Sequence, residues 1–495
     1  PLQYWLGAAT FDALGVDEWT ARLPAAVAGL LAVVAVGFTG ARLAGADAGA
    51  FAALALAGSV WHSGLAHLLT LDSVLSFLLT LALCGFLLAQ RPALSRAAQR
   101  NWMLLAWAAA AGATLTKGLV ALLIPGAALV LYTAVTRDAG PWRRLHALAG
   151  VPLYLALTAP WFVAVERANP GFARFFFVRE HFERFLTESH NRGGEWWYFV
   201  PWFVLGIMPW LLVWAWTLPR SWRAAPVAAN GFSWERFCVV WAAFVFVFFS
   251  VSGSKLPSYI LPMFPALALV LGFELTRLPA RTLAWIALPL AVGATAFLAL
   301  YPFAWPPLAA SLGSENTPVA IYAAFGPWFA AALAAWGAGG IAAVALFRRD
   351  TPAGKAWGVA ALSLSMLIGL QVALVGHDAW ARVRSAQPIL ADAERANGQA
   401  LDPAHPVYQV ASYDQTLPFY LGRPTPLVEY RDEMGPGLLL EPHKGYHEAA
   451  WIEAWNAAPQ AYALMTPGTA AELARKGVPM RELARDPRRV FVARR

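Results

Sequence analysis

Long apolar stretches recur along this chain and restrict its fold more than any other feature. Many of these stretches are about 18–25 residues long and rich in Ala, Leu and Val, a length that matches the hydrocarbon core of a bilayer. Backbone groups inside a bilayer must pair with one another, so such segments fold as helices or as a closed barrel. The stretches lack the alternation of barrel strands. The sequence therefore predicts an all-α polytopic membrane domain.

The composition supports a membrane location. Of the 495 residues, 59% are hydrophobic and 13% are charged, and that charged share is about half of what a soluble domain carries. The two cysteines, Cys84 and Cys238, lie inside apolar stretches and are expected to be core residues. The net charge of +8 lies mostly in loops, so it is explained by membrane topology and predicts no nucleic-acid partner.

The apolar stretches predict about 12 membrane-spanning helices. Their ranges are 21–41, 47–66, 70–90, 102–116, 118–136, 147–165, 199–218, 236–252, 257–275, 283–301, 320–347 and 357–376. Arg and Lys concentrate in alternate loops, around Arg96, Arg143, Arg223, Arg281 and Lys355. The positive-inside rule places these loops in the cytoplasm. The start of the chain and everything after residue 376 then lie on the outer, periplasmic side.

The long outer loop 166–198 departs from this charge bias. Its arginines alternate with acidic and histidine side chains, and they are Arg167, Arg174, Arg179, Arg184 and Arg192. Two interpretations remain open. The loop is either a solvated segment with internal ion pairs or a surface that binds an anion.

Residues 377–495 differ from the rest of the chain, because charge rises and the apolar stretches shorten. Residues 407–412 and 490–492 are typical of short strands, and residues 470–476 are typical of a helix. We predict two domains: a membrane domain over 1–376, which includes the outer loop 166–198, and a small soluble α/β domain over 377–495 on the periplasmic side. No internal repeat is evident, so a transporter built from inverted repeats is not supported.

Four polar residues at membrane depth stand out: Asp72, Lys117, Lys255 and Tyr259. They come from distant parts of the sequence, yet the predicted topology places all of them at the outer face. Ionisable groups at such depth usually serve a function. Each residue also has a simpler interpretation. Asp72 could cap the start of a helix, the two lysines could extend to the lipid headgroups, and Tyr259 could belong to the belt of aromatic residues at the membrane interface.

Cations at an outer interface suit a phosphate that cannot leave the membrane, such as a polyprenyl phosphate. They would stabilise the charge that develops on a phosphate leaving group. A carboxylate nearby could act as a general base on an acceptor hydroxyl.

Several motifs along nearly the whole chain carry a resemblance to a known family. They are Pro1-Leu-Gln-Tyr-Trp-Leu, Trp19-Thr-Ala-Arg-Leu-Pro, Leu71-Asp-Ser-Val-Leu-Ser-Phe, Thr116-Lys-Gly, Phe176-Phe-Val-Arg-Glu-His-Phe-Glu-Arg-Phe, Trp196-Trp-Tyr-Phe-Val-Pro, Ser254-Lys-Leu-Pro-Ser-Tyr-Ile-Leu-Pro and Tyr413-Asp-Gln-Thr-Leu-Pro-Phe-Tyr-Leu. The chain resembles the polyprenyl-phosphate-dependent membrane glycosyltransferases of the GT-C type. Among them it most resembles the aminoarabinose transferases that modify lipid A, which are relatives of the protein O-mannosyltransferases.

The resemblance implies roles for individual residues. Lys117, Arg184, Lys255 and Tyr259 are expected around the lipid phosphate, and Asp72 is expected beside the sugar or acceptor as a catalytic residue. Glu180 and His181 are candidate ligands for a divalent metal ion, although one carboxylate and one imidazole do not complete a metal site.

The family's main catalytic acid and a Glu-Lys pair lie upstream of the Pro1 motif. We therefore expect further residues and one more span before Pro1, which makes about 13 spans in a full chain. Asp17 and Glu18 do not match the position of that acid, and we expect them to cap a helix that begins near Thr20.

The expected function is the transfer of a sugar, 4-amino-4-deoxy-L-arabinose, from undecaprenyl phosphate to a lipid A phosphate. The resemblance also implies a bacterial inner membrane and a contribution to polymyxin resistance. Transfer to a protein or another envelope glycan remains an alternative within this class. A transporter is a remote alternative, because it would spread its charges through the midplane.

Overall fold

The computed structural model describes residues 1–183, 194–223, 227–432 and 434–495. The chain divides into two compact units. The first comprises Pro1–Ala296 and Leu333–Leu370, and the second comprises Phe297–Ala332 and Gln371–Arg495. Each unit is described here by itself.

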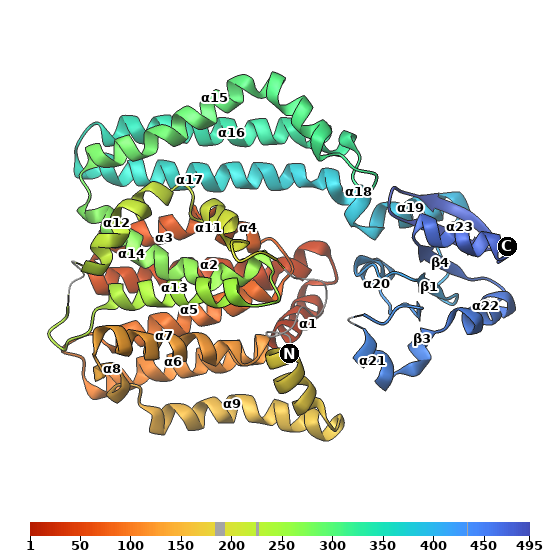
Figure 1. Cartoon of the computed structure of the whole chain (residues 1–495), viewed down its shortest axis with the longest axis horizontal. Coiled ribbons are helices and arrows are strands. Elements are labelled where there is room, and N and C mark those ends of the chain that lie inside the picture. Colours follow the sequence, from red (N-terminus) through yellow and green to blue (C-terminus); the bar gives the residue numbers. More distant parts are fainter. Residues whose placement is uncertain (184–193, 224–226, 433) are drawn as a thin grey trace. The chain divides into compact units, whose positions relative to one another are not determined.

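The first unit is a helical bundle (Figure 1). Its elements up to residue 183 are α1 (Leu2–Leu14), α2 (Glu18–Ala44), α3 (Ala46–Ala57), α4 (Val60–Leu65), α5 (Leu71–Ala89), α6 (Arg96–Lys117), α7 (Val120–Thr136), α8 (Gly140–Arg143), α9 (Ala147–Ala168) and the π-helix η1 (Arg174–Glu183). The elements from residue 194 onward are α11 (Phe199–Ile207), α12 (Leu211–Arg223), α13 (Trp234–Val251), the 3-10 helix η2 (Pro257–Met263) and α14 (Phe264–Arg277).

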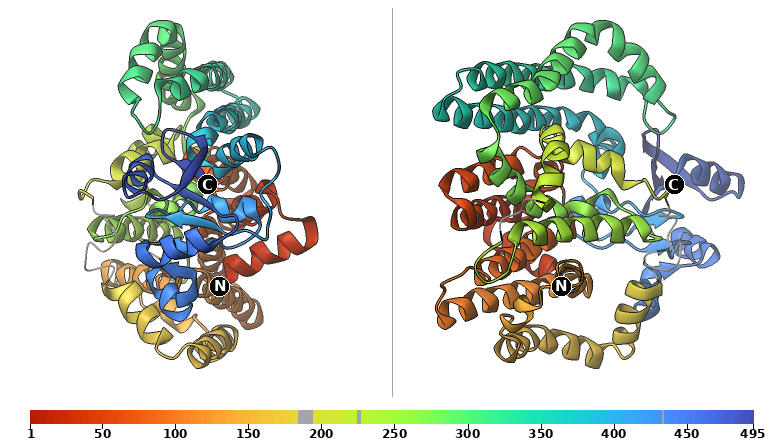
Figure 2. Two further views of the ribbon diagram at one scale, coloured as in Figure 1. Left: turned by 90° about the vertical axis from the view of Figure 1, so that its right-hand side faces the viewer. Right: turned by 60° about the vertical axis from the view of Figure 1, so that its left-hand side comes forward.

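The centre of the bundle is formed by α2, α3, α5, α13 and α14, which pack along one another (Figure 2). Helix α14 and the preceding η2 form the most enclosed candidate span among the described residues, Pro257–Arg277, with 83% of its most apolar window buried. Around it lie the large side chains Trp210, Trp241 and Phe237, all of them buried. A helix that is apolar on every side, as α14 is, suits the middle of a bundle rather than its lipid-facing edge.

Three long helices, α15 (Ala280–Leu312), α16 (Val319–Phe347) and α17 (Pro352–Gly376), run through both units. Small residues allow these helices to approach closely. A Cβ added to Gly340 of α16 would lie 2.9 Å from the Cα of Ala291 in α15. Such close contacts between small residues are typical of helices that associate in a membrane.

Eight helices among the described residues are long and apolar enough to cross a membrane, or nine if the bent pair α11 and α12 forms one span. Two shorter apolar helices, Ala46–Ala57 and Val120–Thr136, accompany them. The chain is therefore a polytopic helical membrane protein. Every one of the predicted apolar ranges coincides with a helix or a pair of helices.

Two of the ranges predicted as continuous are broken in the structure. Range 199–218 divides into α11 and α12, which meet at an angle of 99°. Pro209 lies in the break and has no backbone N–H to continue a helical ladder. Range 47–66 divides at Ser59, whose hydroxyl donates to the carbonyl of Gly206 at 2.6 Å and accepts from the amide of His62. A side chain that serves both roles ends α3 and begins α4.

The predicted cap at the start of α2 is confirmed. Asp17 is the N-cap residue, and its side chain forms a capping box with Thr20. The hydroxyl of Thr20 accepts from the amide of Asp17 at 2.9 Å. These bonds satisfy amides that a helix start otherwise leaves unpaired.

The second unit contains the small C-terminal α/β domain. Its helices are η3 (His377–Trp380), α18 (Ala381–Arg384), α19 (Ala386–Asn397), α20 (Thr416–Leu421), α21 (Gly435–Leu440), η4 (Pro442–Lys444), α22 (Glu448–Ala457) and α23 (Pro467–Arg475). Its strands are β1 (Val407–Val410), β2 (Leu427–Val428), β3 (Gly445–Tyr446), β4 (Tyr462–Met465), β5 (Met480–Arg485) and β6 (Val490–Arg494). The predicted strands near 407 and 490 and the predicted helix near 470 are confirmed.

The strands form one sheet in the order β3-β2-β1-β4-β6-β5, in which the first four are parallel and the last two are antiparallel. Side chains alternate between its faces. In β4, Tyr462 and Leu464 join the core under α19, while Ala463 and Met465 join the core under α22 and α23. The sheet is therefore covered by helices on both faces, as parallel sheets require.

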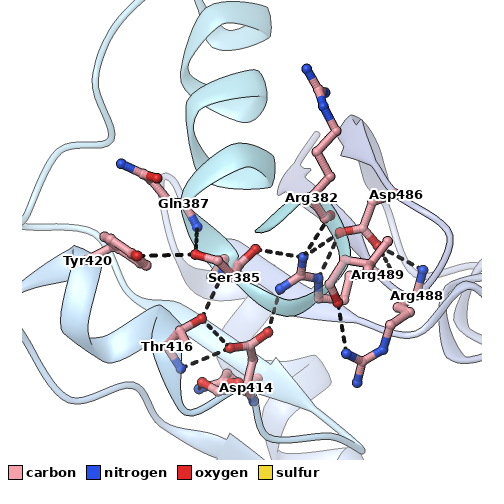
Figure 3. Close-up of polar contacts among 12 residues, drawn as sticks. Arg382, Ser385, Gln387, Asp414, Thr416, Tyr420, Asp486, Arg488 and Arg489 are labelled. Carbon is pink, nitrogen blue, oxygen red and sulfur yellow. Dashed lines mark hydrogen bonds and ion pairs between the residues drawn. The ribbon is translucent and has the colours of Figure 1, made fainter. Parts of the chain in front are cut away.

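A buried arginine fastens the start of this domain (Figure 3). Arg489, 6% exposed, pairs with Asp414 at 2.5 Å and with Asp486 at 2.6 Å. Its guanidinium also donates to the carbonyl of Ser385 at 2.8 Å, just before α19. The loop after β1, the loop before β6 and the segment that follows α18 are thus held by one side chain.

Candidate functional site

The ends of three elements meet in the first unit and bring together residues that are distant in sequence. Asp72 lies in the first turn of α5, and Lys117 is the last residue of α6. Helices α5 and α6 pack against each other as antiparallel neighbours, and η2 also packs on α5. This packing places Asp72, Lys117 and the Ser258–Tyr259 pair of η2 at one site, as the topology predicted for all but Ser258.

Asp72 is the centre of this site, and it is 6% exposed. One carboxylate oxygen accepts a hydrogen bond from the Lys117 ammonium in an ion pair. The other oxygen accepts from the hydroxyl of Ser258 at 2.6 Å. Because both oxygens have partners, Asp72 is oriented before any substrate arrives.

Lys117 has a second partner on the opposite side. Its Nζ lies 4.4 Å from the centre of the Tyr259 ring, which is cation–π distance. The Tyr259 ring in turn packs against Phe249 with a centroid distance of 5.1 Å. The ammonium therefore contacts both a carboxylate and an aromatic face, and its side chain is 27% exposed.

Lys255 lies in the irregular stretch between α13 and η2 and is 8% exposed. Its ammonium donates to the carbonyl of Gly194 at 2.7 Å. Among the residues that the structure describes, no carboxylate pairs with Lys255. Lys117, by contrast, forms an ion pair with Asp72.

The broken backbone of this region is stabilised by a tryptophan. The Trp61 Nε1 donates to the carbonyl of Pro257 at 3.1 Å, and the Trp61 ring packs on Trp202 at 4.8 Å. Non-helical backbone at membrane depth persists only where its polar groups are satisfied or face a cavity. Trp61 supplies one of the required partners and ties α4 to η2.

The remaining predicted site residues fall on the outer loop. Arg184 lies outside the described residues. Glu180 and His181 belong to the backbone of η1, and their side chains lie outside the described part of the chain. Among the side chains that the structure does describe, no group of three or more His, Cys, Asp and Glu is arranged to hold a metal ion.

The sequence analysis missed two members of the site, Ser258 and Trp61. A serine beside a tyrosine carries no signal of its own, although its place between Lys255 and Tyr259 in a Pro-rich stretch could have raised attention. Trp61 belongs to none of the motifs that carry the family resemblance. Neither hydrogen bond follows from local sequence, because each depends on the packing of η2 against α4 and α5.

This arrangement can bind and stabilise an anion at a fixed place. Lys255 offers a charge, and Lys117 is oriented by Asp72 and Tyr259. Preorganised cations of this kind stabilise negative charge as it develops on a leaving group.

Two family models match the chain. Residues 1–163 match the model described as dolichyl-phosphate-mannose-protein mannosyltransferase, and residues 393–494 match the model of the aminoarabinose transferase C-terminal domain. The first match contains Asp72 and Lys117, and the second covers most of the soluble α/β domain.

Solved structures of one bacterial protein are similar over the whole chain. The crystal structure of ArnT from Cupriavidus metallidurans in the apo state is 37% identical, with a TM-score of 0.89 over 100% of this chain and 87% of that chain. The structure of the same protein bound to undecaprenyl phosphate is 38% identical, with a TM-score of 0.90 over 99% and 87%.

Curated relatives carry a consistent name. The undecaprenyl phosphate-alpha-4-amino-4-deoxy-L-arabinose arabinosyl transferase of Edwardsiella ictaluri is 28% identical over 56% of this chain and 49% of its own length. The protein of that name from Pseudomonas paraeruginosa is 30% identical over 67% and 60%. The chain thus spans about half the length of the first of these relatives.

Proposed function

The chain belongs to the aminoarabinose transferase family, and from this premise we propose that it transfers 4-amino-4-deoxy-L-arabinose from undecaprenyl phosphate to a lipid A phosphate. The reaction would take place at the periplasmic face of a bacterial inner membrane. One observation carries the proposal: the buried Asp72 and Ser258 form a charged cluster with the partly buried Lys117 and Tyr259, and Lys255 lies in the irregular segment just before Ser258.

The chemistry suits such a cluster. A lipid A phosphate oxygen attacks the anomeric carbon of the sugar, the bond from that carbon to the undecaprenyl phosphate oxygen breaks, and undecaprenyl phosphate leaves with the electron pair. The nucleophile is already an anion, so the step needs no strong base. The site must instead stabilise charge on the departing phosphate, which is the task of Lys255, of Lys117 and, by the family pattern, of Arg184.

Asp72 serves this scheme by orienting Lys117. In this proposal the negative charge of Asp72 could also attract the amino group of the donor sugar. A protein acceptor is the second candidate, and the match of residues 1–163 to a protein mannosyltransferase model favours it. That acceptor would bring a hydroxyl rather than an anion, and the reaction would then need a base.

Purified protein, expressed from its complete gene, tests the proposal directly. We expect lipid A incubated with undecaprenyl-phosphate aminoarabinose to gain the mass of an aminopentose, and undecaprenyl phosphate to be released in equal amount. Consumption of the donor without a mass gain on lipid A, but with a gain on an added envelope protein, would favour the second candidate.

Removing a phosphate-facing charge should weaken the use of the donor. For Lys255→Ala we expect the KM for the donor to rise about 10- to 100-fold, because a desolvated charge contact is lost. Arg184→Ala is expected to act in the same direction. Lys476→Ala, which removes an exposed lysine from the soluble domain, is the control and should leave the KM unchanged. Full activity of both Lys255→Ala and Arg184→Ala would refute a cationic phosphate site.

Ser258 is a positioning residue, since it acts through Asp72. Ser258→Ala should lower kcat about 10-fold or more, because a hydrogen bond to a charged group stabilises by about 1.5–3 kcal/mol. The donor KM should stay near that of the wild type. Ser258→Thr restores the hydroxyl and should recover most of the turnover. Equal losses in the alanine and threonine variants would indicate a packing role instead.

A further inference from the structure

A cavity lies in the C-terminal α/β domain. Its volume is about 520 Å³. The lining comes from the segments that follow β1 and β2, and most of it is apolar, with Pro418, Phe419, Pro424, Leu427, Met434 and Leu438. A cavity of this size can hold a small ligand or part of a lipid chain.

Helix α21 forms one wall of the cavity and continues the apolar surface outside it. Leu438 lines the cavity, while the next two residues, Leu439 and Leu440, are 82% and 68% exposed. Two adjacent leucines that face outward from a short helix are unusual for a water-facing surface and typical of contact with lipid.

The edge of the cavity carries positive charge. Arg423 lines it and donates to the carbonyls of Pro403 and His405, and no carboxylate among the described residues forms an ion pair with it. Lys444 lines it as well and pairs with Glu441 at 2.6 Å. Among the described lining residues, two cations accompany one acid, so this edge favours an anionic group.

The domain follows a candidate membrane span directly along the chain. Residues 377–385 connect the end of α17, which is part of a candidate span, to the first helix of the domain, α19. A ligand that combines an acyl chain with a phosphate therefore suits both the chemistry of the cavity and its location.

We propose that the cavity under α21 binds the lipid A acceptor, with an acyl chain against Phe419 and Leu438 and a phosphate at Arg423 and Lys444. This inference rests on the proposed function, and it adds a lipid-binding site in the soluble domain to the charged cluster around Asp72.

Gly437 allows the cavity to be filled without disturbing the fold. It lines the cavity, and a Cβ added to it would meet no atom within 4 Å. Gly435 lies in the same helix, also has open space at its Cβ and does not line the cavity. Gly437→Trp and Gly435→Trp are thus a matched pair.

The test measures binding of purified lipid A to the full protein by native mass spectrometry, without donor. Gly437→Trp should weaken binding about 10-fold or more, as the loss of a central apolar contact does at interfaces, while Gly435→Trp should bind like the wild type. Lipid A without its phosphates should bind the wild type more weakly than intact lipid A. Wild-type affinity in Gly437→Trp, or equal losses in both variants, would overturn the proposal.

The binding measurement separates this inference from the proposed function. Suppose that the wild type binds lipid A but transfers no sugar, and that Gly437→Trp does not bind lipid A. The cavity proposal is then supported and the proposed reaction is refuted. If the wild type transfers the sugar to lipid A while Gly437→Trp keeps the acceptor KM of the wild type, the reaction stands and the cavity proposal fails.

Discussion

Asp72→Asn is expected to lower kcat about 100- to 1,000-fold, because a charge that orients a catalytic cation is lost while the shape of the side chain is kept. In the wild type, the Asp72 carboxylate holds the ammonium of Lys117 and accepts from Ser258. The asparagine can still accept from Ser258, but it brings no charge to hold Lys117. A shift of about 1 Å in a catalytic group is enough for a loss of this size.

Turnover of the purified variant, with its thermal unfolding midpoint measured beside it, checks this expectation. Asp392→Asn removes an exposed carboxylate of the soluble domain and should leave kcat unchanged. Lys117→Met should cause a loss similar to Asp72→Asn, and the double variant should lose little more, since the two side chains act as a unit. Wild-type turnover in Asp72→Asn would return Asp72 to the role of a residue that stabilises a helix start.

Arg489→Met is expected to have the largest effect on stability. The methionine fills a similar volume but leaves the carboxylates of Asp414 and Asp486 in a buried place without a cation. Breaking a buried ion pair by removing one partner costs about 3–5 kcal/mol. The carbonyl of Ser385 loses its donor as well, so the start of α19 should loosen together with the loops around β1 and β6.

Hydrogen–deuterium exchange of the full protein measures this loss strand by strand. Amides of β1, β4 and β6 should exchange much faster in Arg489→Met. The matched control is Arg485→Met in β5, since Arg485 and its partner Glu482 are 50% and 46% exposed and such a pair contributes about 1 kcal/mol or less. Equal exchange in the two variants would show that Arg489 does not fasten the domain.

The membrane fold could be predicted from the sequence because it follows from a strong physical constraint. Apolar stretches of bilayer length must be helical. The Arg and Lys residues in the loops indicate which side of the membrane each loop faces. The breaks were harder to predict. Pro209 marks the bend between α11 and α12 by its missing N–H, whereas the break at Ser59 depends on a hydrogen bond to Gly206, far away in the sequence.

The residues around Asp72 were predicted as neighbours on one face, but their contacts were not. The topology places Asp72 and Lys117 on the same side, because α5 and α6 are consecutive antiparallel helices. That they pair directly, and that Ser258 holds the second oxygen, depends on how η2 packs against α5. The packing of helices depends on many side chains at once. Hydrophobic periodicity in the sequence indicates which face of a helix is buried, but not which other helix packs against that face.

The soluble domain shows the same limit. Strands β1 and β6 and the helix near residue 470 were predictable from short apolar runs and turn residues. Arg489 was not, because Arg485, Arg488 and Arg489 look alike in the sequence and only the third is buried with acidic partners. The cavity under α21 was equally hidden, since its walls come from segments that only the sheet order brings together.

The most direct test of the account is the mass spectrum of lipid A from a polymyxin-sensitive Gram-negative strain that lacks its own aminoarabinose transferase and expresses this protein from its complete gene. We predict that lipid A phosphates gain the mass of one aminopentose, and that the gain disappears with Asp72→Asn present at the same level in the membrane. Unmodified lipid A in cells whose membranes contain the wild-type protein would contradict the proposed pairing of donor and acceptor.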